Sequence, residues 1–426
     1  MRPKAEILAE VKRLTQAYFA VRPVGFIPGK SKIDLAVPSY GWEEAYEAIE
    51  SILTTQVTMG EKVKRFEEAF ARYIGVPYAV MVNSGSSANL LALSILANPV
   101  TKDRIKPGDE VITPAVTWAT TVYPIIQMGA VPVLVDVDLD TFNISVPEIE
   151  KAITDRTRAI MLVHLCGNPC DMGPIMEIAR RNQLFVVEDS CESHGAEVNG
   201  KKVGSFGDLA TFSFYFTHHI TTIEGGMVLT SNEEFAELAR ALRAFGWVRG
   251  LKERDRLAES YSDIDPKFLF VNTGYNIRPT EIQGAFGIHQ IKRLEEFIDI
   301  RRDNASYWTE SLKEFSEYLL LHQERPGTRH VWHHYPVTVR PDAPFSRKEL
   351  EGFLNQKGLE TRPIMTGNMA EQPVMGLFKY RKVGGLPNAR IIQRQSFLFG
   401  CHQGIGKEER EAVVEYFREF MAGVRR

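Results

Sequence analysis

Residues 159–187 read AIMLVHLCGNPCDMGPIMEIARRNQLFVV, and this stretch decides the fold class. Short apolar runs rich in β-branched residues stand at its two ends, Ala159–Val163 and Leu184–Val187, with a helical stretch between them. Runs of the same kind precede it at Ala79–Val82, Glu110–Thr113 and Val131–Val135. Alternation of strand-length runs with helices is typical of a mostly parallel sheet flanked by helices. We therefore predict an α/β fold over about residues 61–290.

The segments on either side of this region have a different texture. Residues 1–20 place apolar side chains at helical spacing, Pro and Gly interrupt the pattern in a linker over residues 21–35, and a helix is predicted at Trp42–Leu53. Beyond residue 300 the pattern predicts a strand within Val331–Val339 and helices from about Arg347 and from Lys407. We predict an N-terminal helix and linker (1–35), a large α/β domain (36–295) and a smaller α+β domain (296–426).

The composition excludes several classes of protein. Apolar residues make up 44% of the 426 residues, charged residues make up 25%, and the formal net charge is -3. There is no basic excess that would attract nucleic acid or an anionic membrane. The apolar runs are far shorter than the about 18 residues that a membrane helix needs, and the N-terminus does not read as a signal peptide. We expect a cytoplasmic enzyme.

A glycine–serine turn follows the first strand. Asn83-Ser-Gly-Ser-Ser-Ala-Asn-Leu90 opens a helical pattern, where backbone N–H groups and the helix dipole can hold a phosphate. Gly85 allows a close approach, and Ser86 and Ser87 add hydroxyl donors. A turn that only caps the helix is the alternative.

The segment Thr211-Phe-Ser-Phe-Tyr-Phe-Thr-His-His-Ile-Thr-Thr-Ile-Glu-Gly-Gly226 resembles the active-site segment of the DegT/StrS-type sugar aminotransferases. That family carries FSF, three residues, a lysine and then a Glu-Gly-Gly turn; here His218 occupies the lysine position. The resemblance implies the aspartate aminotransferase-like fold type I, with a seven-stranded, mostly parallel sheet. It also implies pyridoxal 5'-phosphate or its amine form, pyridoxamine 5'-phosphate, as the cofactor.

Further cofactor contacts are implied by the same resemblance. Asp189 matches the aspartate that pairs with the pyridine nitrogen, and Glu192 lies where many relatives carry Gln near the ring hydroxyl. Trp118 matches an aromatic residue that stacks on the ring, and Ser213 matches a phosphate-binding serine. Asn276 matches an asparagine that reaches the phosphate of the neighbouring subunit, which implies a homodimer with shared active sites. Taken alone, Asp189 is equally an N-cap, and Trp118 a packing residue.

Histidine at position 218 changes the expected chemistry. Imidazole cannot form a Schiff base with the cofactor aldehyde but can remove a proton at neutral pH. Such a replacement resembles the 4-keto-6-deoxysugar 3-dehydratases, lyases of deoxysugar biosynthesis such as that of lipopolysaccharide O-antigen. The implied substrate is a nucleotide-linked 4-keto-6-deoxyhexose that loses its carbon-3 hydroxyl, with L-glutamate as amino donor. The alternatives are a dehydratase coupled to a separate reductase and a cofactor-binding protein without catalysis. For His219 we expect an outward-pointing structural role.

The cysteines and two arginines complete the candidate residues. Some of these dehydratases carry a 2Fe–2S cluster, but the matching region here, residues 244–275, contains no cysteine. Cys166, Cys170, Cys191 and Cys401 read as packed thiols, so we expect neither a metal nor an iron–sulfur cluster. Arg249 and Arg362 are candidates for binding the donor carboxylate or the diphosphate, or else surface ion-pair partners.

Overall fold

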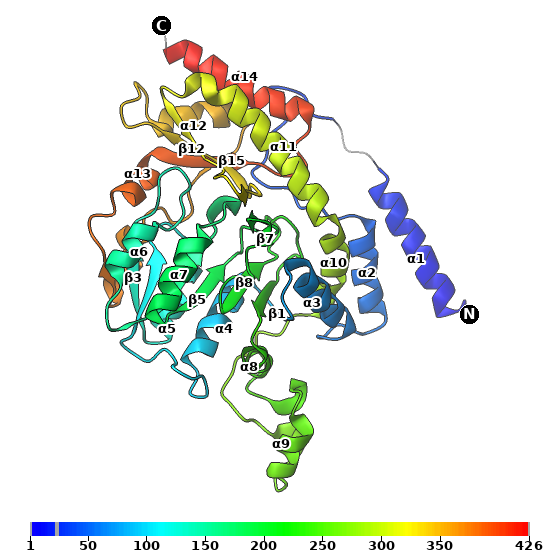
Figure 1. Cartoon of the computed structure of the whole chain (residues 1–426). Helices are drawn as coiled ribbons and strands as arrows, with labels where there is room; N and C mark the ends of the chain where they lie inside the picture. The colour runs from blue at the N-terminus through cyan, green and yellow to red at the C-terminus, as the bar shows by residue number, and fades with distance from the viewer. Residues whose placement is uncertain (1, 22–24, 425–426) are drawn as a thin grey trace.

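The computed structural model describes residues 2–21 and 25–424 and is organised around a large sheet (Figure 1). In the described chain this sheet has eight strands in the order β1-β9-β8-β5-β4-β2-β3-β14. From β8 to β14 neighbouring strands are parallel, whereas β9 is antiparallel to both β1 and β8. Seven of these strands come from residues 78–230, and their bounds are β1 Tyr78–Val82, β2 Glu110–Pro114, β3 Val131–Val135, β4 Thr157–Val163, β5 Phe185–Asp189, β8 Leu209–Ser213 and β9 Gly226–Thr230.

The eighth strand corrects the expected count. β14 (Arg381–Lys382) comes from the C-terminal third of the chain and pairs with β3. Its Arg381 forms an ion pair at 2.7 Å with Glu110, which is buried at the start of β2. A two-residue strand has no apolar periodicity, so the sequence pattern does not reveal it.

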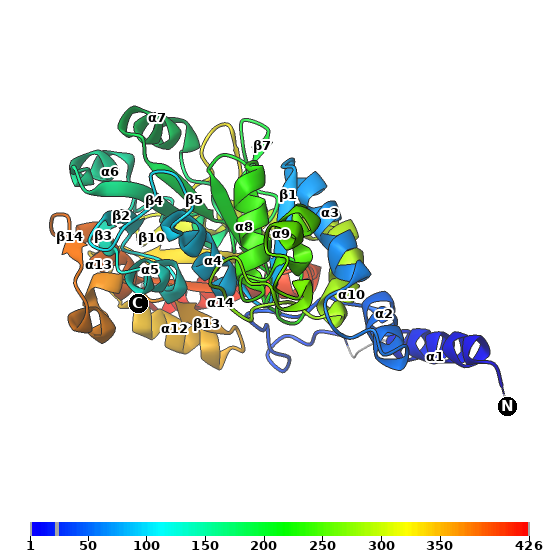
Figure 2. The same ribbon diagram turned by 90° about the horizontal axis from the view of Figure 1, so that it is seen from below.

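Helices cover both faces of the sheet, as Figure 2 shows. Alternate residues of each strand enter two different cores: Ile160 and Leu162 of β4 face one, and Ala159 and Met161 the other. This alternation follows from the two-residue side-chain period of a strand. One core is closed by α3 (Glu61–Ile74), α6 (Val146–Ala152) and α7 (Met172–Asn182), the other by α4 (Gly85–Ala97), α5 (Ala119–Gln127) and α8 (Glu233–Arg243).

The C-terminal part builds a second sheet, which lies above the first in Figure 1. Within the described residues this sheet has the order β10-β12-β15-β13 and is antiparallel throughout. Its strands and the helices over it are β10 Leu319–Leu321, β12 His334–Val339, β13 Thr361–Pro363, β15 Ser396–Gly400, α12 Arg347–Gln356, α13 Pro387–Gln395 and α14 Lys407–Val424. The strand predicted within 331–339 and both predicted helices are present.

Helix α11 (Leu294–Leu312) joins the two parts. Its first turns place Phe297 and Ile298 in the core of the large sheet, and its later turns place Trp308 and Leu312 in the core of the small sheet. Residues 364–392 also pack against the end of the large sheet. The division at residues 295/296 therefore runs through continuous packing, and it stays a prediction.

The N-terminal segment projects from the body of the molecule (Figures 1 and 2). Helix α1 (Lys4–Phe19) contains no buried residue and contacts α2 (Trp42–Leu53), where Lys12 lies over the ring of Trp42. Both helices lie where the periodicity predicts them. Residues 22–24 of the expected linker lie outside the described residues. The remaining helices are α9 (Arg254–Ser260) and α10 (Glu281–Gln290). Among the described helices, none combines the length and the apolarity that a bilayer crossing requires.

Candidate active site

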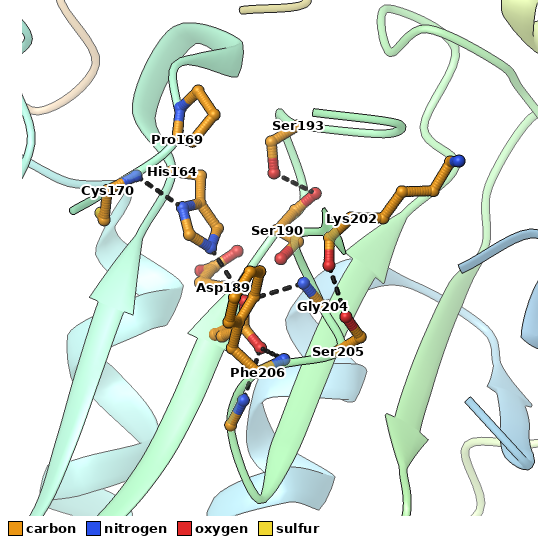
Figure 3. A network of polar contacts seen from close by, with 12 residues as sticks. His164, Pro169, Cys170, Asp189, Ser190, Ser193, Lys202, Gly204, Ser205 and Phe206 are labelled. Carbon is orange, nitrogen blue, oxygen red and sulfur yellow. Dashed lines mark hydrogen bonds and ion pairs between the residues drawn. The ribbon is translucent and has the colours of Figure 1, made fainter. Parts of the chain in front are cut away.

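A buried polar network around Glu188 holds the carboxyl end of β5, and Figure 3 labels its members His164, Gly204 and Phe206. This carboxylate accepts hydrogen bonds from His164 Nε2 at 3.1 Å and from the backbone N–H groups of Gly204 and Gly207 at 2.7 Å. Burial alone would raise the pKa of Glu188, but these donors hold it below its usual value. Because these hydrogen bonds join the loop at 204–207 to Glu188, the loop and the carboxyl end of β5 are fixed relative to each other.

Asp189, the next residue, is buried and points to the opposite face of the sheet. Its Oδ2 accepts hydrogen bonds from Asn89 Nδ2 and Thr121 Oγ1, each at 2.8 Å, and its Oδ1 accepts from the backbone N–H of Cys191 at 3.2 Å. Asn89 is itself oriented by Thr211, whose hydroxyl donates to Asn89 Oδ1. No α-helix starts directly after Asp189 in the described chain, so the N-cap alternative does not hold. The carboxylate retains lone pairs for a further donor.

The glycine–serine turn meets β8 at very close range. Ser84 caps α4 by accepting a hydrogen bond from the backbone N–H of Ser87 at 3.1 Å. A Cβ atom on Gly85 would lie 2.4 Å from the Cβ atom of Ser213, so only glycine allows this contact. Ser86 is exposed beside this turn, and its hydroxyl donates to Thr120 Oγ1 at 3.2 Å. Four predicted phosphate ligands, Gly85, Ser86, Ser87 and Ser213, thus gather at the N-terminus of α4.

His218 lies in the turn between β8 and β9. Its Nδ1 is 3.1 Å from Nε2 of His333, which directly precedes β12 of the small sheet. Burial lowers the pKa of His218 to about 3, and the positive charge of Arg301 acts in the same direction. At neutral pH the imidazole is therefore uncharged, and one of its two ring nitrogens carries a free lone pair.

Further histidines surround this pair. The ring of His194 lies 5.9 Å from that of His218, and the ring of His219 lies 5.7 Å from that of His333. His219 is fully buried, with its Nε2 at 2.9 Å from the carbonyl oxygen of Val331. A structural role therefore fits His219, but the expected outward orientation is wrong, because the segment before β12, with Val331, covers this side of the turn.

Glu192 approaches the same cluster from the segment after β5. Its Oε2 accepts a hydrogen bond from the backbone N–H of Cys166 at 2.7 Å, and its Oε1 is 3.9 Å from Nδ1 of His333. Burial raises the pKa of Glu192 to about 8, so this carboxyl group titrates near neutral pH. His333 thus lies between the imidazole of His218, within hydrogen-bond distance, and the carboxyl group of Glu192, beyond that distance.

The remaining candidate residues lie nearer the surface. Trp118 exposes 55% of its surface at the start of α5, three residues before the Asp189 ligand Thr121. Asn276 is exposed and accepts a hydrogen bond from Arg278 Nε. Arg362 pairs with Glu360 at 3.0 Å, and its charge contributes to the lowered pKa of His334 in the histidine cluster. Arg249 lies over the ring of Trp247 on the segment that leads to α9.

Three residues that orient the predicted ones were not predicted from the sequence. Asn89 and Thr121 fix Asp189, and His333 contacts His218. Asn89 lies in the glycine–serine segment Asn83–Leu90, where a polar side chain on an apolar helix indicates a buried polar contact. For His333 the only signal was the high density of histidines, since residues 330, 333 and 334 are all His.

The thiols are packed rather than paired. Cys166, Cys170 and Cys401 are buried, Cys191 is half-buried, and burial raises the pKa of each. Across residues 2–21 and 25–424, His, Cys, Asp and Glu side chains form no group of three that is arranged to hold a metal ion.

Comparison with known proteins places this geometry in a family. Residues 39–418 match the model of the DegT/DnrJ/EryC1/StrS aminotransferase family. A GDP-4-keto-6-deoxy-D-mannose 3-dehydratase of Escherichia coli O55:H7 is 39% identical over 394 residues, which cover 91% of this chain and 100% of that protein. A dTDP-4-dehydro-2,6-dideoxy-D-glucose 3-dehydratase of Saccharopolyspora spinosa is 38% identical over 93% of this chain and 88% of its own length.

A solved structure shows the same likeness in three dimensions. The crystal structure of a GDP-4-keto-6-deoxymannose-3-dehydratase with a trapped PLP-glutamate geminal diamine superposes with a TM-score of 0.85 at 37% identity. The match covers 90% of this chain and 99% of that chain. The fold type expected from the His218 segment is thereby confirmed.

Proposed function

The chain belongs to the DegT/DnrJ/EryC1/StrS aminotransferase family, and from this premise we propose that it is a nucleotide-linked 4-keto-6-deoxyhexose 3-dehydratase that uses pyridoxamine or pyridoxal 5'-phosphate. The observation that carries the proposal is the neutral imidazole of His218 in the position of the family's lysine. The relatives described above, which are 3-dehydratases by name, support it.

The residues around Asp189 and Gly85 fit this cofactor. The Asp189 carboxylate, fixed by Asn89 and Thr121, suits a protonated pyridine nitrogen, and the half-exposed ring of Trp118 suits the face of the pyridine. Ser213, Ser86, Ser87 and the first N–H groups of α4 suit the phosphate, and Glu192 the ring hydroxyl. When bound, the cofactor supplies an amine for the sugar ketone and an electron sink in its ring.

His218 then acts as the base. Because it carries no primary amine, it does not compete for an aldehyde, and because it is neutral, its free nitrogen can take a proton. The imidazolium can pass that proton to the hydroxyl leaving sugar carbon 3, which departs as water. A lysine at this position would instead favour transfer of the nitrogen to the sugar.

The substrate-binding residues follow from charge. The guanidinium of Arg362 pairs with Glu360 and lies near the histidine cluster. It suits either the carboxylate of L-glutamate, as amino donor, or the diphosphate. Arg249 is the second candidate, on a different surface segment. The base of the nucleotide stays open, because relatives of similar identity carry GDP and dTDP in their names.

A homodimer with shared sites is part of the proposal. Tyr215 and Phe216 expose 40% and 36% of their surface directly beside His218, and a second subunit would remove these rings from water. Asn276 is exposed and free to reach the partner's phosphate. We place the enzyme in the cytoplasm, where nucleotide sugars and glutamate are available.

A product assay tests the function. Purified protein is incubated with the cofactor, L-glutamate and a panel of GDP-, CDP- and dTDP-linked 4-keto-6-deoxyhexoses. The expected result is release of ammonia and a 3,6-dideoxy-4-ketosugar with at least one nucleotide. Formation of an amino sugar with retention of the carbon-3 hydroxyl would contradict the proposal.

A further inference from the structure

His333 lies between the base and the carboxyl group of Glu192. Its Nε2 is 3.1 Å from Nδ1 of His218, and its Nδ1 is 3.9 Å from Oε1 of Glu192. Sequence separation shows that tertiary packing creates this contact, since His218 and His333 are 115 residues apart. A side chain from the small domain thus touches the reacting residue of the large one.

The backbone of His333 has little freedom. Its N–H donates to the carbonyl oxygen of Cys166 at 2.9 Å, and its carbonyl oxygen accepts from the guanidinium of Arg301 at 2.9 Å. Arg301 is fully buried and also donates to the carbonyl oxygen of Cys401. Because hydrogen bonds fix both the N–H and the carbonyl group of His333, its imidazole can hold the ring of His218 in one orientation.

The hydrogen bond between the two rings links their tautomers. One ring nitrogen must carry the proton and the other must accept it. If Nδ1 of His218 is the donor, its Nε2 has a free lone pair and is basic. If Nε2 of His333 is the donor, neutral His218 carries its proton on Nε2 and cannot serve as a base through that atom.

We propose that His333 is a positioning residue, which accepts a hydrogen bond from Nδ1–H of His218 and so presents Nε2 of His218 as the basic nitrogen. The proposal rests on the proposed function for its kinetic consequence, but the tautomer can be measured without turnover. His333 then carries its own proton on Nδ1, the nitrogen that faces Glu192.

Most titratable groups around the pair are uncharged at neutral pH. Arg301 is the cation beside the cluster, and His194, His219 and His334 are buried neighbours whose pKa values are all lowered, so they are uncharged at neutral pH. Glu192 is the acidic group that faces His333. When His218 takes a proton, the Nδ1–H bond to His333 becomes charge-assisted and strengthens.

Steady-state kinetics test the role of His333. We expect His333→Phe to lower kcat for dehydration about 10- to 100-fold with little change in KM, because the supporting hydrogen bond is lost while substrate contacts remain. His333→Gln, whose amide oxygen can accept from Nδ1–H, should restore part of the loss. The control is His194→Phe, which removes a buried ring that makes no hydrogen bond in the described structure and packs against Phe212.

The tautomer itself is read by nitrogen-15 NMR of histidine-labelled protein without substrate. The resonances missing in His218→Asn belong to His218, and we expect them to show a protonated Nδ1. In His333→Phe they should shift toward a protonated Nε2, whereas in His194→Phe they should not.

Two results would overturn the inference. One is a protonated Nε2 on His218 in the unmodified protein, and the other is a folded His333→Phe variant with unchanged kcat. Failure of the function looks different: the unmodified protein would then make no dideoxy sugar, whatever the His218 tautomer.

Discussion

A single side chain, His218, separates this site from those of aminotransferases. The structure places its ring against His333, beside the turn that presents Ser213 and Gly85. Lysine at this position would restore a primary amine. We therefore expect His218→Lys, loaded with pyridoxal phosphate and treated with borohydride, to gain the mass of one reduced cofactor.

The unmodified protein and His218→Asn are the matched samples for this experiment. Neither has an amine at position 218, so neither should form the adduct. A folded, cofactor-loaded His218→Lys variant without an adduct would show that position 218 does not face the cofactor aldehyde.

At the scale of elements, the critical contact is that between the start of α4 and the end of β8. A methyl group on Gly85 would overlap the side chain of Ser213, and both elements are buried, so relief of the overlap would disturb the packing around them. We expect Gly85→Ala to lower the free energy of unfolding by about 1–3 kcal/mol and to weaken cofactor binding. Urea unfolding and a cofactor titration measure the two effects.

Gly352 supplies the control at the same scale. It lies inside α12, and no atom lies within 4 Å of the position that an added methyl group would take. Gly352→Ala should therefore stabilise the protein by about 0.5–1 kcal/mol and leave cofactor binding unchanged. Equal stability of Gly85→Ala and the unmodified protein would mean that α4 and β8 are not in this close contact.

At the scale of the whole molecule, buried histidines link stability to pH. Burial lowers the pKa of eight of the ten histidines, at positions 194, 218, 219, 322, 330, 333, 334 and 402. Below about pH 6.5 the unfolded chain binds protons that the folded chain does not bind, so stability falls by up to about 1.4 kcal/mol per pH unit for each such histidine. Glu192, whose pKa is raised to about 8, acts in the opposite direction.

We therefore expect the urea midpoint to drop steeply between pH 7 and pH 5. In His194→Phe the fall in the free energy of unfolding over this range should be smaller by about 2 kcal/mol, because one neutral buried imidazole is gone. A midpoint that is flat over this range would mean that these histidines are solvated in the native state.

The shared active site that we propose is a property of the homodimer. Hybrid dimers of a His218→Asn subunit and an Asn276→Asp subunit should contain one site with both native residues, and so recover about half the activity of the unmodified dimer. Each variant alone should have little activity, since one lacks the base and the other directs a carboxylate at the phosphate. Inactive hybrids would show that Asn276 serves its own subunit.

Local patterns in the chain were enough to locate many elements. The runs that predicted β1 to β5 match strands within two residues at either end, and Trp42–Leu53 and the helix from Lys407 are helices. These predictions hold because strand and helix periodicity are properties of neighbouring residues. Strands β8 and β9 fall outside these runs, and the structure locates them.

The candidate site depends partly on the sequence alone and partly on the tertiary structure. The sequence by itself determined that imidazole replaces an amine at position 218, because that is a matter of covalent chemistry. Only the tertiary structure decided that Asn89 orients Asp189, that His333 contacts His218, that His219 is buried and that β14 extends the large sheet. These contacts join residues up to about 250 positions apart, and their geometry arises only when both cores close together on α11.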